Sequence, residues 1–200
     1  MYKVGITGGI ASGKSTICKI FELLGVPVYY ADDRAKRLMT ASKSIKHQII
    51  TVFGAEAYYK NGRLNRKHIG SIAFNDPFVL KKLNAIVHPA VIQDGLDWFE
   101  NLKDFPYALK EAALLIESGS YKSLDKTIVV TCPEEIRLLR AAKRDKAKVT
   151  DIKSRMQNQM PDDERIKFAD FIINNDGNDL LIPQILDIHL QILAQSKQHG

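Results

Sequence analysis

The sequence predicts an α/β fold in which a five-stranded parallel sheet lies between layers of helices, a three-layer arrangement. The first observation is that short apolar segments alternate along the 200 residues with longer segments of helical periodicity. The second is that the first apolar segment leads through a glycine-rich turn into a helical pattern, as in a β-α-β unit with parallel strands. The expected strands are 2–7, 26–30, 107–111, 127–131 and 171–174.

The glycine-rich turn has the spacing G-x-x-x-x-G-K-[ST], the P-loop that binds nucleoside triphosphates. Gly8 and Gly13 leave room for successive backbone N–H groups to surround a phosphate, and Lys14 can reach the β- and γ-phosphates. The Ser15 hydroxyl is placed to hold Mg²⁺. The expected nucleotide contacts are Gly8, Gly9, Ile10, Ala11, Ser12, Gly13, Lys14, Ser15 and Thr16.

About seventy residues of mainly helical pattern separate the second strand from the third, which is more than a simple crossover needs. Asn65 and Asp76 are expected to cap helices in this region, and Asn61-Gly62 is an expected tight turn. This helical insert is a natural place for a second substrate. Its expected helices are 32–39, 44–53, 65–74, 78–87 and a separate one opened by His88-Pro89.

Further helices are expected after the fourth strand, at 133–146, 150–159 and 161–168, and after the fifth, at 180–193. Thr150 is the expected cap of the second of these helices. The first carries Arg137, Arg140 and Arg144 on one face, at i, i+3 and i+7. Arginine matches phosphate oxygens and can offset charge during phosphoryl transfer, whereas a solvated helix face is the alternative.

The net charge of +6 is concentrated in residues 137–155, which hold eight Lys/Arg and two acids. One short basic patch fits a polyphosphate better than a nucleic acid, which needs many distributed contacts, so we expect no nucleic-acid partner. No apolar run approaches the ~20 residues that span a bilayer, and no signal peptide precedes the first strand. We therefore expect a cytoplasmic protein without membrane attachment, in which Cys18 and Cys132 are buried free thiols.

Several polar side chains follow predicted strands at their carboxyl ends, where ligands of open α/β sheets bind. Asp32 or Asp33 could accept the proton of an attacking hydroxyl, or simply cap the next helix. Glu111 could orient Mg²⁺ or its waters, or be an ordinary strand-end residue. In the insert, His88 could contact a substrate phosphate or cap a helix. The residues alone leave each of these alternatives open.

An ordered set of short motifs accompanies the P-loop. In chain order they are Val28–Asp33 (VYYADD), Leu64-Asn65-Arg66, Ile86–Pro89 (IVHP), Leu114–Glu117 (LLIE), Arg140–Asp145 (RAAKRD), Gln159, and Ala169-Asp170 with Asn175. With the P-loop stretch TGGIASGKST, this order resembles the dephospho-coenzyme A kinase family over nearly the whole chain. The P-loop alone occurs in many unrelated enzymes, but the ordered set is specific.

The resemblance implies a P-loop kinase fold with a helical substrate-binding insert and a helical lid. It implies transfer of the γ-phosphoryl group of ATP, with Mg²⁺, to the ribose 3′-hydroxyl of dephospho-coenzyme A, the final step of coenzyme A biosynthesis. A monomer or weak homo-oligomer is expected. The implied parts are a core of residues 1–31, 105–133 and 168–200, an insert of about 32–104 and a lid of about 134–167.

The resemblance also assigns roles to single residues. Asp32 would be the general base, and it would act together with Lys14 and Arg140 in the transfer. The other implied contacts are Arg144 in the lid over ATP, Asn175 near the adenine, and Arg66 and His88 facing the acceptor.

The sequence departs from the family pattern at three positions. Tyr30 stands where the family has an aspartate, and this leaves Asp32 without that acidic neighbour. Ala113 replaces a proline, and Arg137 stands where glutamine is frequent. None of these removes the P-loop lysine, the base or the lid arginines, so we expect an active enzyme. Two other functions share the P-loop, namely a kinase of another small acceptor such as a nucleoside and a nucleotide-hydrolysing switch.

Overall fold

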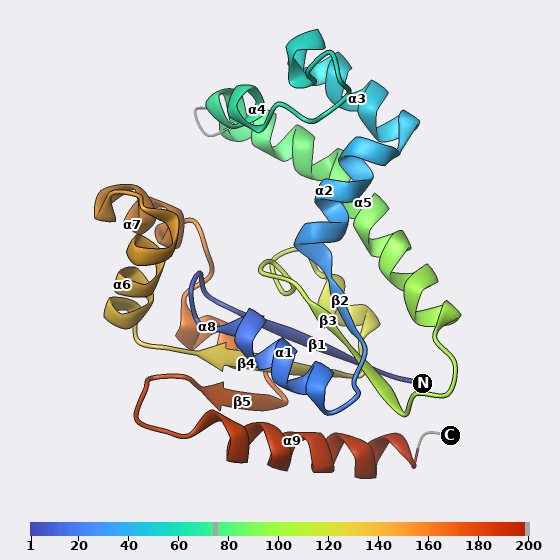
Figure 1. The fold of residues 1–200 in the computed structure, drawn as a ribbon, viewed down its shortest axis with the longest axis vertical. Helices are drawn as coiled ribbons and strands as arrows, with labels where there is room; N and C mark the ends of the chain where they lie inside the picture. Colours follow the sequence, from blue (N-terminus) through green and yellow to red (C-terminus); the bar gives the residue numbers. More distant parts are fainter. Residues whose placement is uncertain (74–75, 199–200) are drawn as a thin grey trace. The chain divides into compact units, whose positions relative to one another are not determined.

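The computed structural model describes residues 1–73 and 76–198. Five strands form one parallel sheet in the order β2-β3-β1-β4-β5 (Figure 1), which confirms the predicted fold class. Strand β2 begins only at Val28 because Pro27 has no N–H to donate to the ladder. The strands are β1 Tyr2–Gly8, β2 Val28–Tyr30, β3 Tyr107–Glu111, β4 Lys126–Thr131 and β5 Phe171–Asn174.

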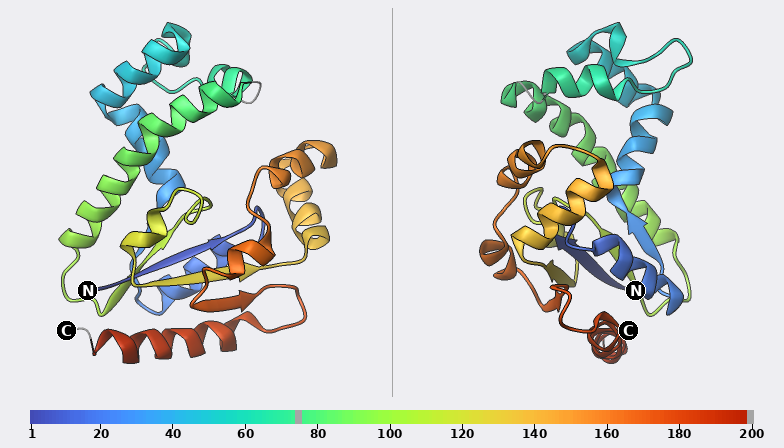
Figure 2. Two further views of the ribbon diagram at one scale, coloured as in Figure 1. Left: turned by 180° about the vertical axis from the view of Figure 1, so that it is seen from behind. Right: turned by 60° about the vertical axis from the view of Figure 1, so that its left-hand side comes forward.

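The two faces of the sheet are covered differently. Val4 and Ile6 of β1 share a buried core with α1 (Lys14–Leu23) and α9 (Leu181–Ser196), which lie on one face (Figures 1 and 2). On the other face, a Cβ at Gly5 would lie 2.5 Å from Leu115 Cδ2, so the segment after β3 packs directly on the backbone of β1. Helices and connecting segments therefore enclose β1, the strand that leads into the P-loop.

Three helices lie between β4 and β5 in the chain. Figures 1 and 2 show α6 and α7 beyond the carboxyl end of β4, where the chain enters α6. The expected cap by Thr150 is wrong, because α7 begins one residue earlier and its N-cap position is Lys148, which makes no side-chain cap. The helices are α6 Glu134–Asp145, α7 Val149–Gln157 and α8 Asp162–Ile166, and a 3₁₀ turn, η2, spans Ser120–Ser123.

The chain divides into two compact units, Met1–Tyr30 with Phe99–Gly200 and Ala31–Trp98. The second unit has its own buried core, which includes Ile45, Ile49 and Phe53. Its elements are α2 Ala31–Ala41, α3 Lys43–Phe53, the 3₁₀ turn η1 Ala55–Ala57, α4 Arg66–Ala73 and most of α5 Pro77–Asn101.

The predicted caps of the helical unit are present. Asn65 Oδ1 accepts a hydrogen bond from the His68 N–H at 3.2 Å, and Asp76 Oδ1 accepts one from the Phe78 N–H at 2.8 Å. Both satisfy backbone donors that a helix start would otherwise leave free. The expected end of the first of these helices, Phe74, lies outside the described residues.

The predicted break at His88-Pro89 is wrong, because α5 runs unbroken from Pro77 to Asn101 with Pro89 inside it. An internal proline removes one helix hydrogen bond and costs about 3 kcal/mol. Val87 and Val91 are buried on either side of it, so packing of the flanking turns offsets that cost. Within the described residues, no helix is long and apolar enough to cross a membrane. Cys18 and Cys132 are buried free thiols, as predicted.

Candidate nucleotide site

The P-loop connects β1 to α1 through a backbone that few residues tolerate. Gly13 has a φ of 101° at the start of α1, and Ala11 has a φ of 59° although it carries a Cβ. A left-handed backbone at a non-glycine residue costs roughly 1–2 kcal/mol, and such strain is characteristic of functional loops. A Cβ at Gly8 would overlap with the Val130 carbonyl oxygen, so Gly8 is required by its close approach to β4.

Lys14 lies inside the loop that it follows. The residue is 9% exposed, and Nζ donates hydrogen bonds to the carbonyl oxygens of Gly8 at 2.8 Å and Gly9 at 3.2 Å. The ammonium group is thus held among the backbone groups of the P-loop at the N-terminus of α1. A phosphate bound there would meet a fixed positive charge together with the helix dipole.

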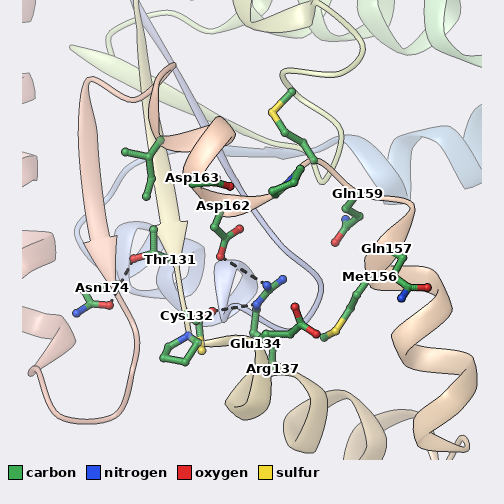
Figure 3. Close-up of a pocket in the computed structure, with 14 residues that line it drawn as sticks. Thr131, Cys132, Glu134, Arg137, Met156, Gln157, Gln159, Asp162, Asp163 and Asn174 are labelled. Atoms are coloured by element: carbon green, nitrogen blue, oxygen red, sulfur yellow. Dashed lines mark hydrogen bonds and ion pairs between the residues drawn. The ribbon is translucent and has the colours of Figure 1, made fainter.

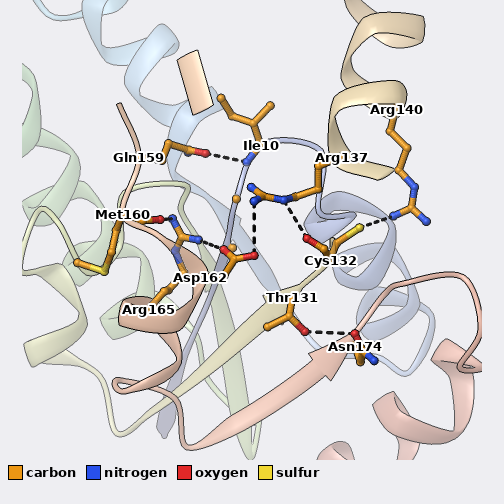
Figure 4. A network of polar contacts seen from close by, with 12 residues as sticks. Ile10, Thr131, Cys132, Arg137, Arg140, Gln159, Met160, Asp162, Arg165 and Asn174 are labelled. Carbon is orange, nitrogen blue, oxygen red and sulfur yellow. Dashed lines mark hydrogen bonds and ion pairs between the residues drawn. The ribbon is translucent and has the colours of Figure 1, made fainter. Parts of the chain in front are cut away.

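Two distant amide side chains hold the loop in this shape. Gln159 Oε1 accepts a hydrogen bond from the Ile10 N–H at 2.8 Å (Figure 4). Asn175 Nδ2 donates to the Ser12 carbonyl at 2.7 Å, and it lies so close to Gly13 that a Cβ there would overlap with it. Apolar contacts add to this support, because the P-loop also packs against buried residues of α6 and α7.

The three predicted arginines of α6 have different surroundings. Arg137 is 9% exposed, and a Cβ at Gly9 would overlap with its guanidinium, so this side chain lies directly on the P-loop. Arg140 NH1 donates to the Asn175 carbonyl at 3.1 Å and contacts Cys132 Sγ at 3.4 Å. Burial raises the pKa of the Cys132 thiol, which keeps it neutral beside these cations.

Arg144 is not brought to the P-loop. Its side chain is 58% exposed, and Nε donates to Asp145 Oδ1 at 2.7 Å. Asp145 also accepts a hydrogen bond from Arg155 at 2.9 Å, and the two guanidinium groups, Arg144 foremost, lower the pKa of this carboxyl to about 2. The structure therefore places Arg137 against the P-loop and Arg140 against Asn175, whereas Arg144 contacts neither.

A buried ion network lies beside Arg137 that the sequence did not reveal. Arg165 is fully buried, forms an ion pair with Asp162 and donates to the Met160 carbonyl at 2.7 Å (Figure 4). Glu117 lies 3.5 Å from the same guanidinium, and Asp162 lies 3.6 Å from Arg137. The sequence predicts a helix for this segment, and its run of charges gives no sign that Arg165 alone among them is buried by tertiary packing.

A cavity of about 560 Å³ opens beside this network (Figure 3). It lies at the carboxyl ends of β4 and β5 and reaches the segment between α7 and α8. Through Gln159 it adjoins the P-loop at Ile10. Its polar lining includes Thr131, Arg137, Gln159, Asp162 and Asn174.

Glu111 stands at the carboxyl end of β3, next to the P-loop strand. Glu111 is 7% exposed and pairs in the sheet with Ile6 of β1 and Tyr30 of β2. Burial raises the pKa of the Cys18 thiol, the Glu111 carboxylate raises it further, and Lys14 opposes the shift. Glu111 and Lys14 are therefore both near the same face of α1.

The remaining predicted residues belong to the helical unit. Asp32 and Asp33 lie in the first turn of α2, where Asp33 pairs with Lys36 at 2.5 Å. Arg66 is the first residue of α4. His88 lies within α5, where burial lowers the pKa of its imidazole, so it is neutral at pH 7.

Comparison with known proteins identifies the family. The dephospho-CoA kinase family profile matches residues 2–180. A dephospho-CoA kinase of Bacteroides fragilis is 36% identical over 186 residues, covering 93% of this chain and 90% of the relative. A dephospho-CoA kinase of Salinibacter ruber is 38% identical over 188 residues, covering 90% and 92%.

Solved structures agree with this result. A dephospho-CoA kinase from Campylobacter jejuni has a TM-score of 0.71 at 30% identity, covering 99% of this chain and 98% of that one. A Thermus thermophilus protein, TT1252, has a TM-score of 0.81 at 30% identity, covering 97% of both chains. A shikimate kinase from Acinetobacter baumannii, with a TM-score of 0.56 at 15% identity, covering 98% and 94%, shares the fold. This chain belongs to the dephospho-CoA kinase family.

Proposed function

We propose that this chain transfers the γ-phosphoryl group of ATP to the ribose 3′-hydroxyl of dephospho-coenzyme A, giving coenzyme A and ADP. The observation that carries the proposal is the preformed P-loop, with Lys14 inside it, in a chain of this family. The proposal treats the unit Ala31–Trp98 as the acceptor-binding insert and residues 134–167 as the lid.

On the donor side, the backbone of Gly8–Thr16 would surround the phosphates, and Lys14 would contact the β- and γ-phosphates. Arg140 and Asn175, which already touch each other, would hold the nucleotide from the far side of the loop, Asn175 near the adenine. Arg144 would join them only after it leaves Asp145, when the lid closes. Closure would keep water from the γ-phosphate.

The residues present fit a Mg²⁺ ion bound with ATP. Mg²⁺ prefers oxygen ligands and takes few of them from protein, the rest coming from phosphates and water. The Ser15 hydroxyl at the start of α1 would supply one, and the buried Glu111 carboxylate would orient bound water. When bound, the ion would offset the charge of the transferring phosphoryl group.

On the acceptor side, Asp32 would accept the proton of the 3′-hydroxyl as its oxygen attacks the γ-phosphorus and the bond to ADP breaks. Asp33 is the weaker candidate because it already pairs with Lys36. Chain continuity supports this role, since Asp32 follows the end of β2 by two residues, at the edge where ligands of such sheets bind. Arg66 and neutral His88 would contact the acceptor within the helical unit.

An ADP-release assay with separate acceptors tests the proposal. Dephospho-coenzyme A should support turnover, with ³¹P NMR placing the new phosphate on the 3′-oxygen, and Lys14→Ala should abolish it. Faster turnover with adenosine or AMP would instead indicate a kinase of another small acceptor. ADP formed at the same rate without any acceptor would indicate a nucleotide-hydrolysing switch.

A further inference from the structure

Arg137 has surroundings that set it apart from the other cations of α6. Its guanidinium lies on Gly9, where the three atoms nearest to a built Cβ all belong to Arg137. Nε donates to the Cys132 carbonyl at 2.9 Å, which fixes the direction of the side chain (Figure 4). The side chain is 11% exposed, so the charge is held at the loop and not in solvent.

The bonds of Arg137 leave part of its guanidinium available. Within the described part of the chain, the Arg137 side chain donates one hydrogen bond, from Nε to the Cys132 carbonyl. NH2 forms an ion pair with Asp162 Oδ2, but their separation of 3.6 Å is too long for a hydrogen bond. Asp162 is closer to Arg165, which also attracts Glu117. NH1, above Gly9, therefore keeps N–H donors directed at the loop that would hold phosphates.

We infer that Arg137 is a phosphate-binding residue of this chain, which contacts the polyphosphate of ATP from the side of α6, and that Asp162 is its positioning residue. This inference rests on the proposed function for its substrate. Arginine offers a planar pair of donors to phosphate oxygens, and a partly desolvated cation strengthens each bond. Lys14 binds from within the loop, whereas Arg137 binds from above Gly9.

The same contact leaves no room for a Cβ at residue 9. The φ of Gly9 is not in the left-handed region, so its backbone would accept alanine. The three atoms nearest to a methyl group there all belong to the Arg137 side chain, with NH1 at 1.9 Å, so this side chain would have to move. Gly9→Ala should therefore displace the Arg137 guanidinium from the P-loop without removing its charge from the protein. This substitution gives a second way to test the contact between Arg137 and Gly9.

The test is binding of ATP and of inorganic tripolyphosphate to the full chain, measured by calorimetry with Mg²⁺. Arg137→Ala should weaken both by about tenfold or more, as expected for loss of a charge-assisted hydrogen bond. Arg137→Lys should recover part of the loss. Asp162→Asn should weaken both ligands less than Arg137→Ala, because the cation remains but is less fixed. Lys143→Ala, which removes an exposed charge from the same helix, should change neither affinity.

Gly9→Ala completes the test as a double-mutant cycle. It should weaken tripolyphosphate binding in the wild-type background and have little further effect in Arg137→Ala. If Gly9→Ala weakens tripolyphosphate binding equally in both backgrounds, the inference is overturned. It is also overturned if Arg137→Ala folds and binds tripolyphosphate like wild type but melts at a lower temperature, because that is the behaviour of a purely structural residue. If Arg137-dependent binding holds while dephospho-coenzyme A is not phosphorylated, the proposed acceptor is wrong and this inference stands.

Discussion

Gly13 illustrates how single residues shape the nucleotide site. Its φ of 101° is costly for any residue with a Cβ, and a Cβ there would also overlap with Asn175 Nδ2. Asn175 in turn bonds to the Ser12 carbonyl and accepts from Arg140. A substitution at this glycine therefore disturbs the loop and the side chains that would hold ATP at the same time.

Gly13→Ala should weaken ATP binding at least tenfold, because the added methyl group displaces Asn175 from the loop. Gly177→Ala is a matched control, since its φ is 96° but no atom lies within 4 Å of a built Cβ. The control should lose roughly 1 kcal/mol of stability and keep its ATP affinity. Calorimetric titration with ATP and urea denaturation of both variants check this, and equal ATP affinities for the two would contradict it.

Asp32 and Asp33 are adjacent carboxylates with different expected roles. Asp32→Asn should lower kcat by orders of magnitude and leave ATP affinity nearly unchanged, because an amide cannot accept the proton of the acceptor. Asp33→Asn loses only an exposed ion pair with Lys36 and should stay within a few-fold of wild type. Single-turnover kinetics with dephospho-coenzyme A decide between them. Comparable kcat in Asp32→Asn would remove Asp32 as the base.

At the scale of elements, a buried charge links α8 to the segment after β3. Arg165 is fully buried, and its partners Asp162 and Glu117 come from α8 itself and from the segment after β3. A buried cation of this kind adds little net stability over an apolar core, but its removal takes from Asp162 and Glu117 the guanidinium that they share. The five-residue α8 depends on this interaction because it is too short to be stable alone.

Arg165→Met, which keeps the volume of the side chain, should lower the free energy of unfolding by about 3–5 kcal/mol. Lys167→Ala, which breaks an exposed ion pair with Glu164, should lower the free energy of unfolding by only about 0–1 kcal/mol. Adding Glu117→Gln to Arg165→Met should recover part of the loss, because Glu117 is the carboxylate left without a cation, whereas Asp162 still pairs with Arg137. Urea denaturation measures all three, and no recovery would mean that packing, and not charge, explains the effect.

At the scale of the whole molecule, two separate groups of buried residues stabilise the two units. The sheet core includes Ile128, and the core of the helical unit includes Ile49, and both residues are 0% exposed. Because each unit has its own core, each can lose stability by itself. In a kinase that has to admit two substrates, such independence allows one unit to open locally while the other stays folded.

Ile49→Ala and Ile128→Ala should each lower the free energy of unfolding by about 2–5 kcal/mol. We expect each substitution to destabilise only the unit in which it lies. Native-state hydrogen exchange should show faster exchange in α3 and α4 for Ile49→Ala, with the sheet amides unchanged. The sheet strands should lose protection in Ile128→Ala, with α3 and α4 unchanged. Loss of protection across both units in either variant would mean that the molecule unfolds as one cooperative body.

Some elements followed from local pattern alone. The strand Phe171–Asn174 has the predicted limits, and the caps at Asn65 and Asp76 are present, because apolar runs and capping side chains act over a few residues. The continuous α5 did not follow. Proline opposes a helix locally, but burial of Val87 and Val91 depends on distant parts of the chain.

The P-loop, the parallel sheet and the family were determined by the sequence, since spacing of glycines, lysine and apolar residues acts through the backbone nearby. Which arginine of α6 lies on the loop was decided by tertiary structure. Arg137, Arg140 and Arg144 share a helix face in the sequence, yet Arg137 reaches Gly9 and Arg144 turns to Asp145. The reason is that helical periodicity sets only the direction of a side chain, whereas its partner depends on the segments that folding brings beside it.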